Sequence, residues 1–333
     1  MNAASHNPAS PDVSSSESTL RKTSGATSSD ASGSTVFTAA PDAKAAVAKP
    51  IIRQNTHRTP RWWFSVILTY VFLAAGALLM LVPFLFSVMT SLKTSHQFSS
   101  EPPLNLPDPL TFDNYTALFS GSNNFIVPLA VTVQVVAVLT IGQMVFSVLA
   151  AFAFARLQFP GREIIFWAYI ATLMIPPIVL MIPLYSMVSQ VGMRNTFAGL
   201  VVPFVLGSPY AIFLLRQNFQ AVPQEVLDAA KLDGAGQWRS LWSIVLPMNK
   251  PILATLFLIT VVTQWNNFLW PSIIAPGKEW NVLTVATSAL QTQYSGNWTL
   301  VMAATTVSLL PLVLLFLAFH KQIVNSLGIS GLK

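Results

Sequence analysis

The sequence contains no cysteine, which excludes disulfide bonds, thiolate metal sites and cysteine nucleophiles. It is also poor in charge: only 9% of its 333 residues are charged, whereas soluble domains carry about a quarter. Hydrophobic residues make up 53% and the mean hydropathy is +0.58, so lipid is the predicted solvent for most of the chain. The net charge of +6 comes from scattered bases rather than a basic stripe, so we expect no nucleic-acid partner.

Asp, Glu, Lys and Arg are absent from the interiors of six apolar runs. Each run reaches the roughly 20 residues needed to cross about 30 Å of hydrocarbon. Continuous runs of this length are typical of helices, since backbone polar groups must be satisfied within lipid, and the alternation of barrel strands is missing. We therefore predict an all-α, multi-pass protein of the cell membrane, surrounded by lipid. Its six transmembrane helices are expected at 62–90, 125–154, 164–189, 196–215, 251–275 and 299–319.

Basic residues predict the orientation of these helices. Fifteen of the 18 Lys and Arg residues fall in the N-terminal arm, the even-numbered loops and the C-terminus, and three fall in the odd-numbered loops. By the positive-inside rule, both termini are expected to be cytoplasmic. The arm, residues 1–55, is rich in Ser, Thr and Ala without hydrophobic periodicity, so we expect it to be disordered. Residues 60–333 are expected to form the transmembrane domain.

The longest predicted cytoplasmic connection between spans, residues 216–250, contains signals for a short helix at about 223–234. Pro223 and Glu225 are typical of a helix start, and Gly234 after Asp233 is a suitable left-handed stop. Ala229 and Ala230 would let one face approach another protein closely, with charged side chains at the rim, although this spacing also fits any surface helix. The rim charges are Asp228, Lys231 and Asp233.

A second amphipathic helix is predicted to follow in the same connection. Its apolar residues recur at i, i+3, i+4 and i+7, and its tryptophans suit a membrane interface. The stripe consists of Trp238, Leu241, Trp242 and Val245, and Pro247 is expected to end the helix.

The two motifs in this connection resemble a known signature. Asp228-Ala229-Ala230, three residues, Gly234, nine residues and Ile244-Val245-Leu246-Pro247 are similar to the E-A-A-x3-G-x9-I-x-L-P signature of binding-protein-dependent ABC importer permeases. Asp228 departs from the usual Glu, which keeps the acid but shortens it by one methylene. Gln264 to Pro271 is similar to a fifth-span pattern of carbohydrate permeases, with Asn267 in place of Asp. The chain resembles the maltose-type second permease subunit over residues 60–333.

The resemblance implies a coupling helix that lies between spans four and five and docks on a cytoplasmic ATPase dimer. It also implies a second permease subunit and an extracytoplasmic sugar-binding protein. The residues it assigns to ATPase coupling are Glu225, Asp228, Ala229, Ala230, Asp233, Gly234, Ile244, Leu246 and Pro247. The chain has no G-x-x-x-x-G-K-[ST] phosphate loop, so ATP hydrolysis is assigned to a partner chain, and we expect no cofactor and no metal.

Neutral polar and aromatic residues within the spans are candidates for a sugar path, because hydrogen bonding and stacking suit an uncharged polyol. The same residues are also typical of interhelical contacts. The candidates are Tyr185, Gln264, Trp265, Asn266 and Asn267.

Two alternatives remain from the sequence. A stand-alone secondary carrier is disfavoured, because the span interiors lack the ionisable groups that proton-coupled carriers use, although backbone sites could bind sodium. A membrane-embedded enzyme would need clustered catalytic side chains near the span ends, and no such cluster is visible in the sequence.

Overall fold

The computed structural model describes residues 60–120, 124–293 and 297–328. The arm predicted to be disordered, residues 1–55, lies outside the described residues. The described residues belong to one compact unit, and they are helical with no β-strand among them.

Five helical segments are long and apolar enough to cross a membrane, and these confirm five of the six predicted spans. Two of the five are interrupted by a short break rather than being one helix. The five segments are formed by α1 (Pro60–Ser91); α4 (Ile126–Arg156); α7 (Phe197–Val201), η2 (Val202–Phe204) and α8 (Pro209–Gln220); α12 (Lys250–Trp265) and α13 (Leu269–Ile274); and α15 (Trp298–Gly328).

The remaining span, expected as one helix at 164–189, is broken. It consists of α5 (Arg162–Ala171), the 3₁₀ turn η1 (Thr172–Met174) and α6 (Pro177–Gln190), and the two parts are bent by 102°. The break falls at Ile175 and Pro176, both of which have extended ψ angles. Adjacent prolines at 176 and 177 remove two backbone donors and force the preceding residues out of the helical region.

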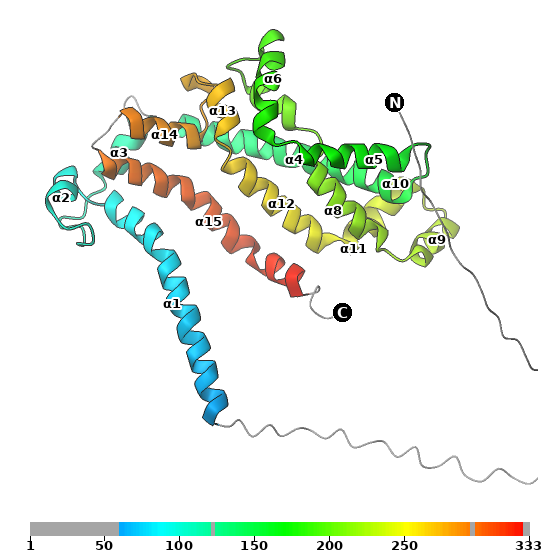
Figure 1. Cartoon of the computed structure of the whole chain (residues 1–333), viewed down its shortest axis with the longest axis horizontal. Coiled ribbons are helices and arrows are strands. Elements are labelled where there is room, and N and C mark those ends of the chain that lie inside the picture. The colour runs from blue at the N-terminus through cyan, green and yellow to red at the C-terminus, as the bar shows by residue number, and fades with distance from the viewer. Residues whose placement is uncertain (1–59, 121–123, 294–296, 329–333) are drawn as a thin grey trace, which may run out of the picture. The chain divides into compact units, whose positions relative to one another are not determined.

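Helix α4 is the centre of the packing. It lies against α8 and α12, while α15 packs on α1 and α12 (Figure 1). Gly142 on α4 allows the close approach of the α7–α8 segment, because a Cβ atom there would lie 2.7 Å from the carbonyl oxygen of Val205. Most of α1 is exposed, and its buried residues, Ser87, Thr90 and Ser91, lie near its C-terminal end.

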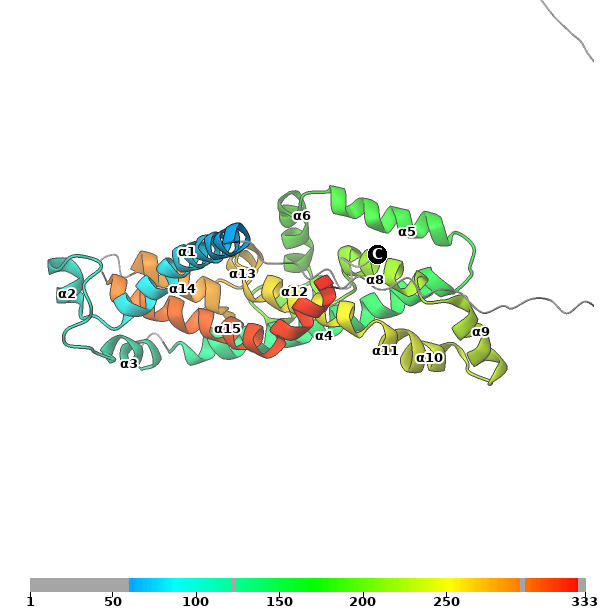
Figure 2. The same ribbon diagram turned by 90° about the horizontal axis from the view of Figure 1, so that it is seen from below.

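Helices that lie outside the spans gather at two places. The first group is α2 (Ser95–Ser100), α3 (Asp113–Phe119), η4 (Lys278–Trp280) and α14 (Leu283–Gln293). The second group is α9 (Gln224–Leu232), α10 (Gln237–Ser240), the π-helical η3 (Leu241–Val245) and α11 (Leu246–Met248). Both views place α2 and α3 at the opposite end of this unit from α9 and α10 (Figures 1 and 2).

The segment between α1 and α4 is held by polar contacts to backbone groups. Lys93 is 1% exposed, and its Nζ donates to the carbonyl of Pro103 at 3.2 Å. Asn114 on α3 donates to the carbonyls of Ser91 and Lys93 at 2.9 and 2.8 Å. These bonds satisfy carbonyls at the end of α1 that have no partner within that helix.

Candidate functional site

Helix α9 has the ends that its sequence predicts. The helix begins at Gln224, one residue later than predicted, so Pro223 is the N-cap and not the first helical residue. Glu225 lies in the first turn. Gly234 follows with φ +81°, and the N–H of Ala235 donates to the carbonyl of Ala230 at 2.9 Å. This bond, together with that from Gly234 to Lys231 at 3.0 Å, forms a Schellman motif, which satisfies carbonyls at the helix end.

Most of the α9 surface is open. The structure describes every residue of α9, and Leu227 is the one that is buried, at 5% exposure. It belongs to an apolar cluster with Phe219 and Val222. Ala229 is exposed, Ala230 is half-buried, and Leu232 is 90% exposed. A helix with one buried side chain leaves most of its surface available to a partner.

Asp228, the acidic residue of the signature, is hydrogen-bonded to other side chains of α9. The Asp228 carboxylate accepts bonds from Lys231 Nζ at 2.9 Å and from Gln224 Nε2 at 3.0 Å. These two bonds, that from Lys231 first, lower the pKa of Asp228 below its usual value. Asp228 therefore remains charged on an exposed face at neutral pH. Glu225 and Asp233 are also exposed, so α9 presents several carboxylates.

The second helix of the connection differs from its predicted pattern. Leu241 and Val245 are buried at 1% and 0%, but Trp238 and Trp242 are 66% and 61% exposed, so the predicted stripe divides between two faces. Pro247 does not end the helical segment as predicted. The segment continues to Met248, because proline is tolerated in the first turn of α11. Ile244 and Leu246 are half-buried and pack on the same apolar cluster as Leu227.

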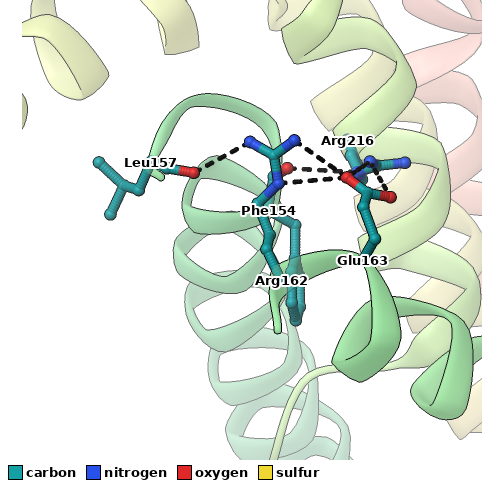
Figure 3. A network of polar contacts seen from close by, with 5 residues as sticks. All are labelled: Phe154, Leu157, Arg162, Glu163 and Arg216. Atoms are coloured by element: carbon teal, nitrogen blue, oxygen red, sulfur yellow. Dashed lines mark hydrogen bonds and ion pairs between the residues drawn. The ribbon is translucent and has the colours of Figure 1, made fainter. Parts of the chain in front are cut away.

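A buried arginine connects the helices that precede α9. Arg216 lies within α8 and is 7% exposed, although the sequence placed it at the start of the loop. Its Nη2 contacts both carboxylate oxygens of Glu163, at 2.7 and 2.9 Å (Figure 3). Its guanidinium lies 4.0 Å from the centre of the Phe166 ring. Its Nε donates to the carbonyl of Phe154 at 3.3 Å.

Glu163 also pairs with its neighbour Arg162 at 3.0 Å, so one carboxylate joins the α4–α5 connection to α8 (Figure 3). Reasoning from sequence gave Glu163 no role, and it counted Arg162 and Arg216 among the basic residues that set the orientation without predicting that they pair with this acid. An acid in the first turn of α5 was the available signal, since such residues favour a helix start.

Substitution of Glu163 by Gln is expected to lower the stability of the isolated protein by about 1–3 kcal/mol, because the charge of Arg216 would remain buried without its counterion. This loss is smaller than for a fully buried ion pair, because the Glu163 side chain is 49% exposed and solvent screens the pair. Thermal unfolding in detergent measures the effect. Lys250→Gln is the control, because Lys250 is exposed and makes none of these contacts. Equal stability of the two variants would contradict a stabilising pair.

Three of the five candidate sugar-path residues lie together. Gln264, Trp265 and Asn267 line one narrow cavity of about 10 Å³, which has room for about one water molecule but not for a sugar. Trp265 is 6% exposed and its Nε1 donates to the carbonyl of Ser308 at 3.1 Å. Asn266 is exposed and its amide donates to the carbonyl of Val262 at 2.8 Å, which satisfies the end of α12.

Tyr185, the fifth candidate, lies in a different place. It is half-buried on α6, and it packs against the apolar cluster that contains Trp270 and Ile274. In the part of the chain that the structure describes, no three His, Asp or Glu residues lie close enough together to hold a metal ion.

A comparison with known families decides the identity. The family described as "Binding-protein-dependent transport system inner membrane component" matches residues 143–328, which include α9 and most of the spans. The chain belongs to this family. As an inner membrane component of a transport system, it is a transport subunit and not an enzyme.

Curated relatives of this inner membrane component are similar over most of their length. The chain is 30% identical to "Arabinooligosaccharides transport system permease protein AraQ" of Bacillus subtilis, over 81% of this chain and 96% of the relative. It is 31% identical to "sn-glycerol-3-phosphate transport system permease protein UgpE" of Yersinia pestis, over 78% and 95%. It is 30% identical to "Diacetylchitobiose uptake system permease protein NgcG" of Streptomyces coelicolor, over 78% and 87%.

A solved structure shares the fold of this inner membrane component. It is a chain of a bacterial ABC transporter involved in the import of the acidic polysaccharide alginate, with a TM-score of 0.69 and 21% identity. The match covers 79% of this chain and 98% of that one.

Proposed function

We propose that the chain is a permease subunit of an ATP-driven sugar importer and that α9 is its coupling helix. In this proposal α9 docks on a separate ATPase dimer, and the translocation path forms with a second permease and receives solute from an extracytoplasmic sugar-binding protein. The observation that carries the proposal is α9 itself. It is a short helix with a defined end, exposed carboxylates and an exposed apolar residue, and Leu227 is its one buried residue.

The distribution of charge supports a cytoplasmic position for α9. Basic residues of the described helices and loops are concentrated at the α9 side of the spans, as the positive-inside rule expects for a cytoplasmic face. They are Arg61, Arg156, Arg162, Arg216, Lys231, Arg239, Lys250 and Lys321, against Lys93, Arg194 and Lys278 in the loops on the other side. In this orientation α2, α3 and α14 face the extracytoplasmic binding protein.

The candidate path supports an uncharged saccharide as the solute. The residues around Gln264 and Trp265 include no Lys, Arg, Asp or Glu, so a charged solute would find no counterion there. The cavity is too small for a sugar in this chain alone, which is consistent with a path that opens between two permeases. Two of the relatives named above are permeases for oligosaccharides, and the third is a permease for glycerol phosphate.

Cysteine crosslinking in the assembled importer tests the proposal. Because the natural chain has no cysteine, Ala229→Cys gives the permease a single thiol, which lies on α9. We expect this thiol to form a crosslink with the co-expressed ATPase, whereas Leu104→Cys, an exposed position beyond the other end of the spans, should form none. Crosslinking from Leu104, or labelling of Ala229→Cys by an impermeant reagent added outside the cell, would contradict the proposal. Uptake driven by an ion gradient without ATP would favour a secondary carrier.

A further inference from the structure

The corner between α8 and α9 is closed by a side chain from a third helix. Arg156 is the last residue of α4 and is half-buried. Its Nε donates to the carbonyl of Phe219 at 3.1 Å, its Nη1 donates to Oε1 of Gln224 at 2.9 Å, and its Nη2 reaches the carbonyls of Phe219 and Val222. One guanidinium thus contacts the end of α8, the connecting turn and the first residue of α9.

The chemistry of this corner suits arginine. The last carbonyls of α8 have no partner within their own helix, and the C-terminal ends of α4 and α8 both carry partial negative charge. A guanidinium presents five donors in a fixed planar fork, so it can bond several acceptors at once. Lysine has a single nitrogen on a flexible stem and cannot hold the same set in one geometry.

The contacts continue from Arg156 along α9. Gln224, which accepts from Arg156, donates through its Nε2 to the Asp228 carboxylate at 3.0 Å. In addition to these hydrogen bonds, Phe152 of α4 belongs to the same apolar cluster as Leu227. Helix α9 is therefore attached to α4 by an apolar contact and by a hydrogen-bonded chain that reaches the acid of the signature.

We propose that Arg156 is a positioning residue that fixes the coupling helix to α4, so that a displacement of α9 by the ATPase is transmitted to the central span. This inference rests on the proposed function of α9. Without Arg156, α9 would still be attached through Leu227 but could rotate about that contact. ATP hydrolysis would then continue with little movement of α4, and the importer would be uncoupled.

The variant Arg156→Gln in the assembled importer tests this role. We expect the ratio of solute imported to ATP hydrolysed to fall by about tenfold, the order expected when the hydrogen bonds of a charged group are lost. Arg156→Lys should restore little of the ratio. The matched control is Arg162→Gln, which removes a positive charge at the start of α5. The hydrogen bonds of Arg162 go to Leu157 and Glu163 and not directly to α8 or α9, so this variant should keep the ratio.

A distance measurement separates positioning from a general loss of stability. Spin labels at Gln158→Cys and Val226→Cys, both exposed positions, report the separation of the α4 end and α9. We expect a narrow distance distribution in the labelled chain that keeps Arg156 and a broad one in the labelled chain with Arg156→Gln. Both samples should contain the same amount of ATPase per permease. If Arg156→Gln fails to accumulate, Gln224→Ala removes one of the contacts and should broaden the distribution in part.

The outcomes distinguish the two proposals. A narrow distribution and an unchanged transport ratio in Arg156→Gln would overturn the positioning role, while crosslinks from Ala229 to the ATPase would leave the coupling helix in place. Absence of those crosslinks when Ala229→Cys is the only substitution would overturn the coupling function itself.

Discussion

Replacement of Gly234 by valine is expected to abolish solute uptake while the protein still inserts into the membrane. Gly234 has φ +81°, a left-handed conformation that costs an L-residue about 1–2 kcal/mol and a β-branched residue more. A Cβ atom there would meet nothing within 4 Å, so the strain lies in the backbone and not in a clash within the chain. The helix end would unwind and change the surface offered to the ATPase. Uptake of labelled solute by cells measures the effect.

Asparagine at the same position is the matched comparison, because it tolerates the left-handed conformation far better than valine does. We expect Gly234→Asn to keep most of the uptake. Loss of uptake in both variants, with normal insertion, would show that a partner approaches Gly234 too closely for any side chain. Normal uptake by Gly234→Val would contradict a coupling role for this helix end.

Two leucines of α9 are expected to respond in opposite ways to alanine substitution. Leu227 is 5% exposed, so Leu227→Ala should destabilise the isolated permease by about 2–5 kcal/mol through lost packing. Leu232 is 90% exposed, so Leu232→Ala should leave that stability unchanged. If the ATPase buries Leu232, its loss removes about 1.5–3 kcal/mol of binding free energy, which weakens ATPase affinity at least about tenfold.

Thermal unfolding of the permease alone and titration with purified ATPase separate these two effects. Phe112→Ala is a suitable control for both, because Phe112 is an exposed apolar residue near α3, at the opposite end of the unit from α9. Equal ATPase affinity of Leu232→Ala and the natural chain would exclude Leu232 from the docking surface.

The ends of α9 were predictable because their signals are local. A proline and an acid at the start and a glycine at the end act on the residues beside them, and the structure places each within one residue of its predicted position. Five spans were predictable for a similar reason: their length and hydrophobicity are properties of a continuous run.

The broken span could not be read with the same certainty, because membrane helices tolerate proline. Pro83, Pro183 and Pro311 all lie inside helices that continue past them. The adjacent pair at 176 and 177 has a different effect, since two consecutive residues lack donors and the residue before each is restricted. The sequence showed these prolines but not which of them would bend the chain.

The anchors of α9 depend on contacts between distant positions. Arg156 bonds residues 63 to 68 positions away, and Arg216 bonds a carboxylate 53 positions away. The sequence shows that each arginine is a basic residue near the end of a span. It does not show the partners of that arginine, because these depend on how α4, α5 and α8 pack. For the same reason the sequence did not show that the candidate path residues lie in two places: Tyr185 lies in a different cluster from Gln264 and Trp265.

The bend between α5 and α6 has a consequence for assembly. Leu173, Met174 and Ile175 are all exposed there, beside backbone that no longer follows a continuous helix. Hydrocarbon offers no hydrogen bonds to such backbone, so the bend is stable only where another protein surface or water covers it. Under the proposed function, the second permease would supply this cover, and a chain synthesised without it is expected to have a shorter half-life in the cell.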